Sequence, residues 1–196
     1  AFWQPAAVYI DVSVLSTLDQ RQYNAGLVES VKHAVISDES YFQFIEENLD
    51  RILARDFEVL EKMADYNCRI KAAVVEADPT EKNQQVSGFD LLHGEGVSIG
   101  MMGAALIEQK MGIGDSERVS RLENILKKLQ VPTRIPVSLD SNKLIEALKR
   151  DKKAVNQWPK FVLVDRIGRV FCDNGQWAVD AERKLVEQVL SELYEG

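Results

Sequence analysis

Residues 91–114 read LLHGEGVSIGMMGAALIEQKMGIG, a polar triplet that starts with histidine and leads into a long apolar run interrupted by glycine. We interpret the run as an apolar helix that ends at Gly112 or Gly114, because glycine readily adopts the left-handed backbone found after a helix C-terminus. Three earlier glycines fall on or near one face of this helix: Gly96, Gly100 and Gly103. A face without side chains lets a neighbouring helix approach closely. The stretch therefore predicts a tightly packed helix in a helical protein.

On both sides of this stretch, apolar residues recur at helical spacing. We predict helices at residues 19–36, 41–54, 57–76, 116–129, 141–152 and 178–193. Ser37 or Asp38 can cap the second of these and Asp56 the third, because short side-chain oxygens accept hydrogen bonds from the unpaired amides of a first turn. Residues 7–12 predict a short buried strand, and residues 161–172 predict a β-hairpin that turns at Ile167 and Gly168.

The sequence contains no internal repeat, no regular alternation of strand and helix, and no glycine-rich phosphate loop. A dinucleotide-binding fold is therefore not expected within these residues. The fold class that we predict is mainly α with a few short strands, in a single domain over residues 1–196.

The composition is that of a globular protein, with 45% hydrophobic and 28% charged residues. A net charge of −7 argues against general nucleic-acid binding, which needs clustered lysine and arginine. No apolar run approaches the roughly 20 residues that cross a bilayer, and the first residues carry no signal-peptide core. Cys68 and Cys172 form no metal or redox motif and fit structural thiols in a reducing compartment. We expect a cytoplasmic protein that binds neither nucleic acid nor membrane.

Polar side chains beside apolar helix faces are candidates for a chemical site. Glu29 and Lys32 are three residues apart and share a helix face. A surface ion pair is the alternative, although the pair borders an apolar stripe where buried charge is costly. His93 opens the glycine-rich helix beside Glu95, and a structural histidine is the alternative there. Imidazole and carboxylate from separate segments suit Zn²⁺, but a catalytic zinc usually has three protein ligands.

Other basic residues have simple structural alternatives. Lys71 lies near the end of a long helix, where its stem could cover the core while its head stays in water. Residues 150–153, RDKK, form a basic helix end that the helix dipole favours. His33 follows Glu29 by four residues and could in principle share a metal with it. We interpret His33 as a surface residue, because no HExxH-like motif is present.

Five blocks of sequence, in the same order and with similar spacing, resemble the 3-dehydroquinate synthases. They read AFWQPAAVYID, NAGLVESVKHAVI, IKAAVVEADPTE, LLHGEGVSIGMM and RDKK, and the resemblance runs from residue 1 to about residue 172. Members of this family have a Rossmann-like NAD-binding domain followed by a largely helical domain with the metal and much of the substrate site. The resemblance implies that this chain is the second domain and that the NAD-binding domain is absent from it.

The resemblance also implies roles for individual residues. Glu29 and His93 match metal ligands, so the implied cofactors are Zn²⁺ or Co²⁺, together with NAD. Glu81 matches a glutamate assigned as a proton acceptor. Three lysines match substrate-binding positions: Lys32, Lys71 and Lys152. Four residues match a segment that touches NAD: Val14, Leu15, Ser16 and Thr17.

The chain departs from the family pattern between Glu81 and His93, which only eleven residues separate. The family carries there a segment resembling LNxGHTxGHAIE, which supplies the third metal ligand, a second catalytic histidine, and an arginine and an asparagine for substrate. A disordered loop left out of the sequence, a deletion or an evolutionary loss would each explain the difference. The family-like residues on both sides of Gln85 favour the first explanation. A loop that carries a metal ligand is also a natural candidate for disorder, because its order depends on bound metal.

The activity implied by the resemblance is that of an NAD-dependent, phosphate-eliminating lyase. Family members cyclise 3-deoxy-D-arabino-heptulosonate 7-phosphate, a sugar-acid phosphate, to 3-dehydroquinate. They do so in the shikimate pathway to chorismate and the aromatic amino acids, and they commonly form homodimers. We expect this chain to be inactive alone. A sedoheptulose 7-phosphate cyclase of the same superfamily and a non-catalytic helical binding module are the alternatives. Lys71 and Lys152 favour a carboxylated substrate over the first of these.

Overall fold

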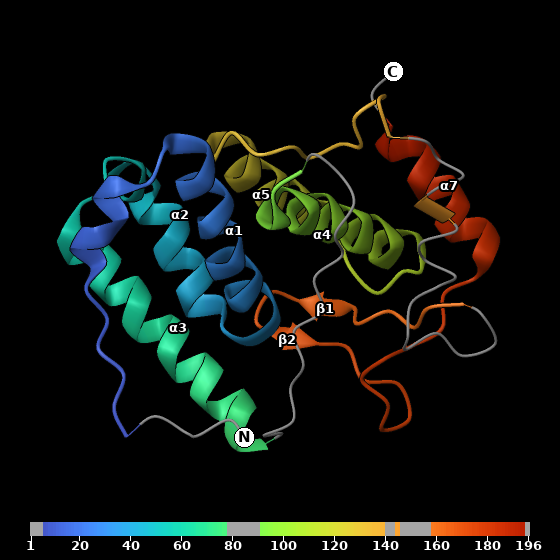
Figure 1. The fold of residues 1–196 in the computed structure, drawn as a ribbon. Coiled ribbons are helices and arrows are strands. Elements are labelled where there is room, and N and C mark those ends of the chain that lie inside the picture. The colour runs from blue at the N-terminus through green and yellow to red at the C-terminus, as the bar shows by residue number, and fades with distance from the viewer. Residues whose placement is uncertain (1–5, 78–90, 140–143, 146–157, 195–196) are drawn as a thin grey trace.

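The computed structural model describes residues 6–77, 91–139, 144–145 and 158–194, and it confirms a predominantly helical chain (Figure 1). A short 3₁₀ helix, η1 (Val12–Thr17), precedes the helices α1 (Gln20–Ser37), α2 (Glu39–Leu53) and α3 (Phe57–Ala77). The helices α4 (His93–Lys110) and α5 (Ser116–Lys128) follow. The later elements are β1 (Val164–Arg166), β2 (Arg169–Val170) and α7 (Arg183–Leu193).

Aspartate side chains begin several of these helices by accepting hydrogen bonds from first-turn amides. Asp38 caps α2 by accepting from the amide of Tyr41 at 3.1 Å, and Asp56 begins α3 by accepting from that of Glu58 at 3.0 Å. Two more aspartates cap α1 and α5 in the same way: Asp19 and Asp115. The predicted caps at Asp38 and Asp56 are therefore confirmed.

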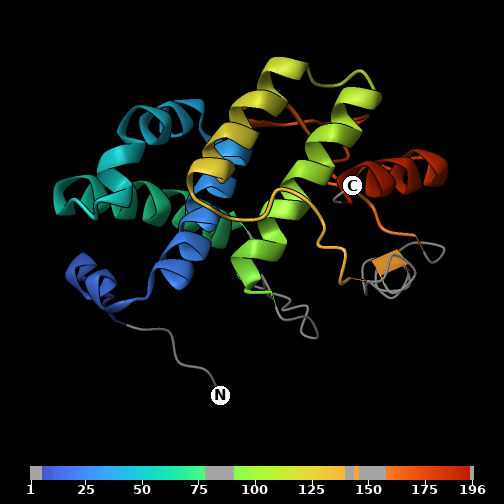
Figure 2. The ribbon, with the colours of Figure 1, turned by 90° about the horizontal axis from the view of Figure 1, so that it is seen from above.

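The helices α1 and α4 lie at the centre of the protein. α1 packs against α2, α3, α4 and the hairpin, while α4 packs against α1, α5, α7 and β1. Figure 2 shows α4 and α5 side by side over α1, with α7 on the other side of α4. Val28 and Val31 of α1 and Leu126 of α5 are fully buried in the shared core. Side chains on α1 and α4 are thus held by the most extensively packed part of the molecule.

α1 and α4 approach each other closely at Ala25 and Gly94. A methyl group on Gly94 would lie 1.9 Å from the carbonyl oxygen of Ala25, so only glycine permits this crossing. The predicted close approach at Gly96 and Gly100 is wrong, because nothing lies within 4 Å of a Cβ built at either position. Gly103 meets a side chain of α7 at 3.4 Å. Glycine spacing along one helix does not show which turn meets a neighbour.

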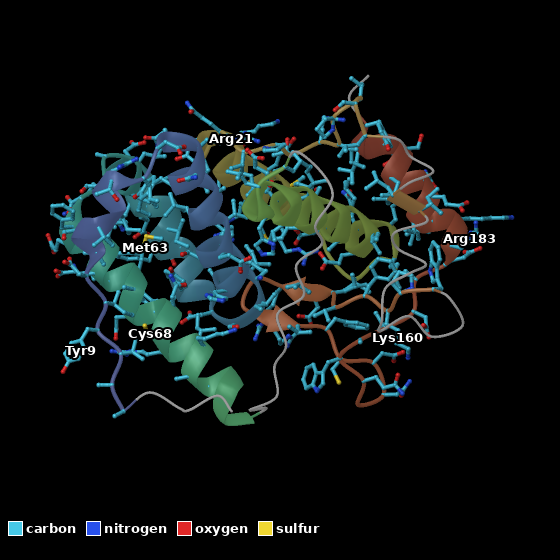
Figure 3. All side chains as sticks on the ribbon, viewed as in Figure 1. Tyr9, Arg21, Met63, Cys68, Lys160 and Arg183 are labelled. Carbon is cyan, nitrogen blue, oxygen red and sulfur yellow. The ribbon has the colours of Figure 1, made fainter. Side chains whose placement is uncertain are left out.

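The predicted strand at residues 7–12 is not formed. The backbone is irregular up to η1, and Val8, Tyr9 and Ile10 are 73%, 95% and 57% exposed. Figure 3 shows the Tyr9 side chain pointing away from the body of the protein. A strand needs a partner for its amide and carbonyl groups, and none of the described residues pairs with this segment. Apolar composition alone therefore does not make a strand here.

The predicted hairpin is confirmed. β1 and β2 pair antiparallel and turn at Ile167 and Gly168, where φ is +82°. The Gly168 amide donates to the Val35 carbonyl at 2.8 Å, and a Cβ on Gly168 would lie 2.4 Å from the Glu39 amide nitrogen. The turn therefore docks on the end of α1, and β1 also packs against α4.

The last helix begins at Arg183, later than the predicted residue 178. Val179 forms an isolated antiparallel bridge with Phe161, and the Trp158 indole donates to the Ala181 carbonyl at 3.1 Å. The residues before α7 therefore pair with another segment and do not extend the helix. The predicted helix at 141–152 lies outside the described residues, apart from residues 144–145, which are helical. In the described parts of the chain, no helix is long and apolar enough to cross a membrane.

Candidate functional site

Glu29 of α1 and His93 of α4 meet where the two helices cross. His93 Nε2 lies 2.9 Å from Glu29 Oε1, and Lys32 Nζ lies 2.5 Å from Glu29 Oε2. His93 and Lys32 therefore hold the two oxygens of one carboxylate, although His93 is 64 residues away from it in sequence. The fold thus places the two predicted metal ligands in direct contact, with one predicted substrate lysine beside them.

A second contact between the helices holds the turn that carries His93. Arg21 Nε and Nη2 donate to the Glu95 carboxylate at 2.6 and 2.8 Å, and the same carboxylate accepts from the Leu92 amide at 2.9 Å. Figure 3 labels Arg21 at one end of α1. A bidentate pair fixes geometry as well as adding energy. With Gly94 packed directly on α1, the first turn of α4 is fixed on both sides of His93.

Three residues of α1 at four-residue intervals form the stripe that the first turn of α4 covers: Arg21, Ala25 and Glu29. Residues four apart share a helix face. Reasoning from the sequence missed Arg21 and Gly94. The four-residue spacing was a usable signal for Arg21, because this residue extends the face that Glu29 defines.

The surroundings keep the Glu29 carboxylate charged. Partial burial by itself raises its pKa, but the hydrogen bonds and charges of Lys32 and His93 outweigh burial and hold the pKa below its usual value. Hydrogen bonds from Arg21 lower the pKa of Glu95 against a smaller effect of burial. Both carboxylates are therefore anionic at neutral pH. The Glu29 side chain is 33% exposed and so is accessible to a cation from solvent.

The donors at Glu29 and His93 fit a divalent transition metal in kind but only partly in number. Carboxylate and imidazole are usual Zn²⁺ ligands, and a catalytic zinc site typically has three protein ligands and one open position. Among the residues that the structure describes, no cluster of three or more His, Cys, Asp or Glu side chains could hold a metal. Lys32 contacts Glu29 Oε2, so a metal bound at that oxygen would displace the lysine.

The other predicted site residues have separate positions. Lys71 is half-buried in the last third of α3, a helix that packs against α1. Four residues of η1 match the predicted NAD-contacting segment, and all are exposed except the half-buried Leu15: Val14, Leu15, Ser16 and Thr17. Glu81 and Lys152 lie outside the described residues.

Arg55 holds η1 against the helical body. Its guanidinium donates to the carbonyls of Leu15, Ser16 and Leu18 at 3.0, 2.9 and 2.8 Å. The same group lies over the Tyr23 ring, 4.5 Å from the ring centroid. Arg55 adopts a φ of +59° at the junction of α2 and α3. Neither this backbone conformation nor the three contacts could be read from the sequence.

His33 takes part in a network between α1, α2 and α3. Its Nδ1 atom lies 3.0 Å from Asn67 Oδ1, and the Asn67 amide donates to the Ser30 hydroxyl at 2.8 Å. The Tyr41 hydroxyl also donates to Asn67 Oδ1, at 3.2 Å, and burial raises the pKa of Tyr41 to about 12. His33 is therefore a half-buried structural residue, which corrects its interpretation as a surface residue.

A hollow of about 450 Å³ lies between α1, α4, α5 and β1. Lys32, which pairs with Glu29, is one of the residues that line it. Most of the wall is apolar and includes Val35, Ile36 and Val97. The hollow therefore adjoins the Glu29 contact but differs from it in chemistry.

A buried ion pair between Glu108 of α4 and Arg118 of α5 forms part of the wall of the hollow. Arg118 Nη2 lies 2.5 Å from Glu108 Oε2, and the side chains are 8% and 3% exposed. The Val164 amide donates to Glu108 Oε1 at 2.5 Å, and Arg118 Nη1 donates to the Val164 carbonyl. Gly114 makes room for the guanidinium, since a Cβ there would lie 1.9 Å from Arg118 Nη2. Burial raises the pKa of Glu108, and the Arg118 charge offsets this only in part.

Known sequences match most of the chain. The family model described as 3-dehydroquinate synthase C-terminal matches residues 26–87 and 84–154. The 3-dehydroquinate synthase of Acetivibrio thermocellus is 39% identical over 211 residues, covering 100% of this chain and 57% of the relative. That of Ruminiclostridium cellulolyticum is 38% identical over 208 residues, covering 98% of this chain and 56% of the relative. The chain therefore spans little more than half the length of these curated relatives.

Solved structures share the fold. ValA, a 2-epi-5-epi-valiolone synthase from Streptomyces hygroscopicus with NAD⁺ and Zn²⁺ bound, has a TM-score of 0.78 at 20% identity, covering 94% of this chain and 54% of that one. A 2-deoxy-scyllo-inosose synthase complexed with carbaglucose-6-phosphate, NAD⁺ and Co²⁺ has a TM-score of 0.60 at 20% identity, covering 93% and 55%. At these identities the likeness shows the helical fold and no more.

Proposed function

The chain belongs to the 3-dehydroquinate synthase C-terminal family, and we propose that it is the metal- and substrate-binding domain of a 3-dehydroquinate synthase. Within a longer protein it acts in the cyclisation of 3-deoxy-D-arabino-heptulosonate 7-phosphate to 3-dehydroquinate, with elimination of phosphate. The observation that carries the proposal is the contact of Glu29 Oε1 with His93 Nε2, 2.9 Å apart. It joins two residue types that zinc or cobalt favours, from distant parts of the chain.

In this proposal Glu29 and His93 hold the metal, which when bound acidifies and orients a substrate hydroxyl. Glu29 supplies negative charge, since its lowered pKa keeps it ionised. His93 supplies a ring nitrogen, a usual zinc donor. Arg21 and Glu95 are positioning residues, because their bidentate contact fixes the turn on which His93 lies.

Lys32 is the substrate-binding residue that the geometry supports best. It lies 2.5 Å from the carboxylate that would bind the metal. A divalent cation at Glu29 would compete for that carboxylate and release the lysine toward an anionic substrate. Lysine suits carboxylate and phosphate groups because it is a compact cation with three donors. Lys71 and Lys152 add positive charge for the same substrate, and Glu81 accepts a proton.

NAD binding in this proposal involves η1 and a domain outside this chain. The segment Val14–Thr17 is largely exposed, and Arg55 holds it in one conformation. Those properties suit a segment that touches a cofactor bound mainly elsewhere. Residues 1–196 are then one metal- and substrate-binding domain that needs an NAD-binding domain for activity. We place the intact enzyme in the cytoplasm as a homodimer.

A cyclase of sedoheptulose 7-phosphate is the second candidate. The solved structures with this helical fold are named as synthases of other cyclic products. The 3-dehydroquinate synthases that match at 33–39% identity favour the first candidate. A non-catalytic helical module is the third, and such a module is not expected to bind Zn²⁺ at Glu29 and His93.

The test is phosphate release by a chimera in which this chain replaces the matching part of the Acetivibrio thermocellus relative. The relative's positions without a counterpart in this chain are kept. The proposal predicts release from 3-deoxy-D-arabino-heptulosonate 7-phosphate with NAD⁺ and Zn²⁺, and its loss in Glu29→Gln and His93→Ala. Glu58→Gln, in an exposed ion pair, is the matched control. Preference for sedoheptulose 7-phosphate would favour the second candidate, and full activity in both site variants would exclude the metal assignment.

A further inference from the structure

The helices α2, α4 and α5 end in the same backbone motif. The residue after the C-cap has a positive φ in each of them, +59° at Arg55, +71° at Gly112 and +54° at Gln130. Its amide donates to the carbonyl three residues earlier, and the next amide donates to the carbonyl five residues earlier. Glycine is the usual residue at this position, because a side chain disfavours a positive φ. Gly112 follows this rule, and the other two residues do not.

Ending a helix does not require arginine at this position. Gly112 ends α4 with the same two hydrogen bonds that end α2 at Arg55. Gln130 shows that the motif tolerates a side chain, and that side chain is exposed. Backbone strain points to function only where the side chain has a task, so the contacts of Arg55 decide its role.

The Arg55 guanidinium lies at the C-terminal end of η1. It donates to the carbonyls of Leu15, Ser16 and Leu18 at 3.0, 2.9 and 2.8 Å. The last carbonyls of a helix lack partners within it and carry partial negative charge, so a cation with several donors is a suitable cap. Arg55 therefore caps a helix that lies about forty residues earlier in the chain.

Tyr23 of α1 holds the guanidinium from below. The guanidinium lies 4.5 Å from the centroid of the Tyr23 ring, and Tyr23 is only 2% exposed. The Tyr23 hydroxyl donates to the Ile52 carbonyl at 2.6 Å, in the last turn of α2. Burial raises the pKa of Tyr23, and the charge of Arg55 offsets part of this rise. The end of α2, the start of α1 and η1 are thus joined through one arginine.

η1 has one face on the protein and one face open to solvent. Val12 is buried and Leu15 is half-buried, and both pack against the core. Val14 is 58% exposed, and residues 16–17 are exposed as well. A 3₁₀ helix of six residues has poor hydrogen-bond geometry and little stability of its own. Arg55 fixes the end of this helix, where the chain turns into α1.

We propose that Arg55 is a positioning residue for the cofactor contact of η1. It adopts an unfavourable backbone conformation at the end of α2, and from there its guanidinium holds η1 in the conformation that meets NAD. The inference rests on the proposed function, in which residues 14–17 touch NAD bound mainly by another domain. Arg55 does not itself touch the cofactor. It orders the contact segment before binding, which removes that entropic cost from the binding step.

Amide hydrogen exchange of the 196-residue chain separates this role from helix termination. Arg55→Gly removes the guanidinium but should still end α2, because glycine readily adopts a positive φ. We expect exchange at residues 14–18 to become at least about tenfold faster, because exchange reports local opening. Exchange in the last turn of α2 should not change.

Gln130→Gly is the matched control for the exchange experiment. It relieves the same backbone conformation at the end of α5 and removes an exposed side chain. Exchange in η1 should therefore stay as in the wild type. Should Arg55→Gly fail to fold, Arg55→Lys takes its place. Lysine keeps the charge but loses the planar fork, so it should show the same change to a smaller degree.

Cofactor affinity tests the functional half of the proposal. The chimera with the Acetivibrio thermocellus relative is titrated with NAD⁺ by calorimetry, which needs no turnover. Arg55→Gly should raise the Kd for NAD⁺ at least about threefold, because the apparent Kd rises as the competent conformation becomes less populated. Gln130→Gly should bind NAD⁺ as the unmutated chimera does. The zinc affinity of the 196-residue chain should not change in Arg55→Gly, which shows that the rest of the domain is intact.

Two outcomes would overturn the proposal alone. Unchanged exchange in η1 of Arg55→Gly would mean that Arg55 does not hold this helix. Faster exchange with unchanged NAD⁺ affinity would leave Arg55 a purely structural residue. A chimera that binds NAD⁺ with the expected difference but releases no phosphate would support the proposal and count against the proposed function. Failure of the unmutated chimera to bind NAD⁺ would count against both.

Discussion

The two ends of α4 carry the same kind of contact in opposite surroundings. At the N-terminal end His93 meets Glu29, with side chains 58% and 33% exposed, whereas at the C-terminal end Glu108 meets Arg118, with side chains 3% and 8% exposed. Burial would raise the pKa of Glu29, but Lys32 and His93 lower it below its usual value. Burial raises the pKa of Glu108 despite the charge of Arg118.

The difference in exposure separates a buried structural pair from a pair whose carboxylate is accessible from solvent. Glu108 and Arg118 both bond to the backbone of Val164, so their polar groups are used in joining α4, α5 and β1. The Glu29 carboxylate contacts only side chains in its hydrogen bonds with Lys32 and His93, and it faces solvent in part. One end of α4 therefore fixes the position of the helix, and the other presents a partly exposed carboxylate and imidazole.

Removing one partner of the buried pair should have the largest effect. Glu108→Ala leaves the Arg118 charge buried and unpaired, which costs about 3–5 kcal/mol of unfolding free energy. Urea denaturation measures the loss. Replacing both residues with apolar side chains, Glu108→Leu with Arg118→Met, should recover most of it, because no charge is then left buried. A loss of unfolding free energy below about 1 kcal/mol in Glu108→Ala would mean that the pair does not stabilise the packing of α4, α5 and β1.

The crossing of α1 and α4 should tolerate no added side chain. Gly94→Ala places a methyl group 1.9 Å from the Ala25 carbonyl oxygen, so the helices must shift. Overpacking of this kind costs about 1–3 kcal/mol. Gly96→Ala is the control, since nothing lies near its Cβ position and helix propensity favours alanine by up to about 1 kcal/mol. Equal unfolding free energies for the two variants would contradict the close crossing.

The raised pKa of Glu108 predicts how stability depends on pH. Its pKa returns to the ordinary value of 4.5 on unfolding, so the native state holds this proton more tightly than the unfolded state. The stabilisation is complete below pH 4.5 and is lost as the pH rises through the folded pKa. The unfolding free energy of the wild type should therefore fall relative to Glu108→Gln as the pH rises above 4.5. A difference that stays constant or rises would contradict this assignment.

The exposed pair should matter least for stability. Glu29→Gln removes one charge from a half-exposed cluster, where solvent and mobile side chains compensate, so the cost should be about 0–1 kcal/mol. Urea denaturation of Glu29→Gln and Glu108→Ala under the same conditions compares their unfolding free energies directly. A cost equal to that of Glu108→Ala would show that the two ends of α4 do not differ in role.

Local chemistry made most of the fold predictable. Asp38 and Asp56 start helices because a short acceptor beside free amides works in any surroundings. The prediction of a strand at residues 7–12 was wrong because strand formation depends on a partner segment, which the sequence of the strand cannot show. The prediction of the hairpin was confirmed because the partner of the first strand follows it directly, after a two-residue turn at Ile167 and Gly168.

The candidate site was predictable only in part. Glu29 and His93 were identified from sequence blocks, and the structure brings them together. Gly94 was missed because the need for glycine arises from Ala25 on another helix. Arg55 was missed because its role depends on three carbonyl groups about forty residues earlier in the chain. Both are tertiary effects that no local pattern encodes.

The most direct test of the central claim, that Glu29 and His93 form a metal site, is calorimetric titration of the 196-residue chain with Zn²⁺. The account predicts one site per chain whose affinity falls at least about tenfold in Glu29→Gln and in His93→Ala, since even residues that only support metal ligands change affinity by that much. Glu58→Gln should bind as the wild type does. Equal zinc affinity in the wild type and both site variants would contradict the account.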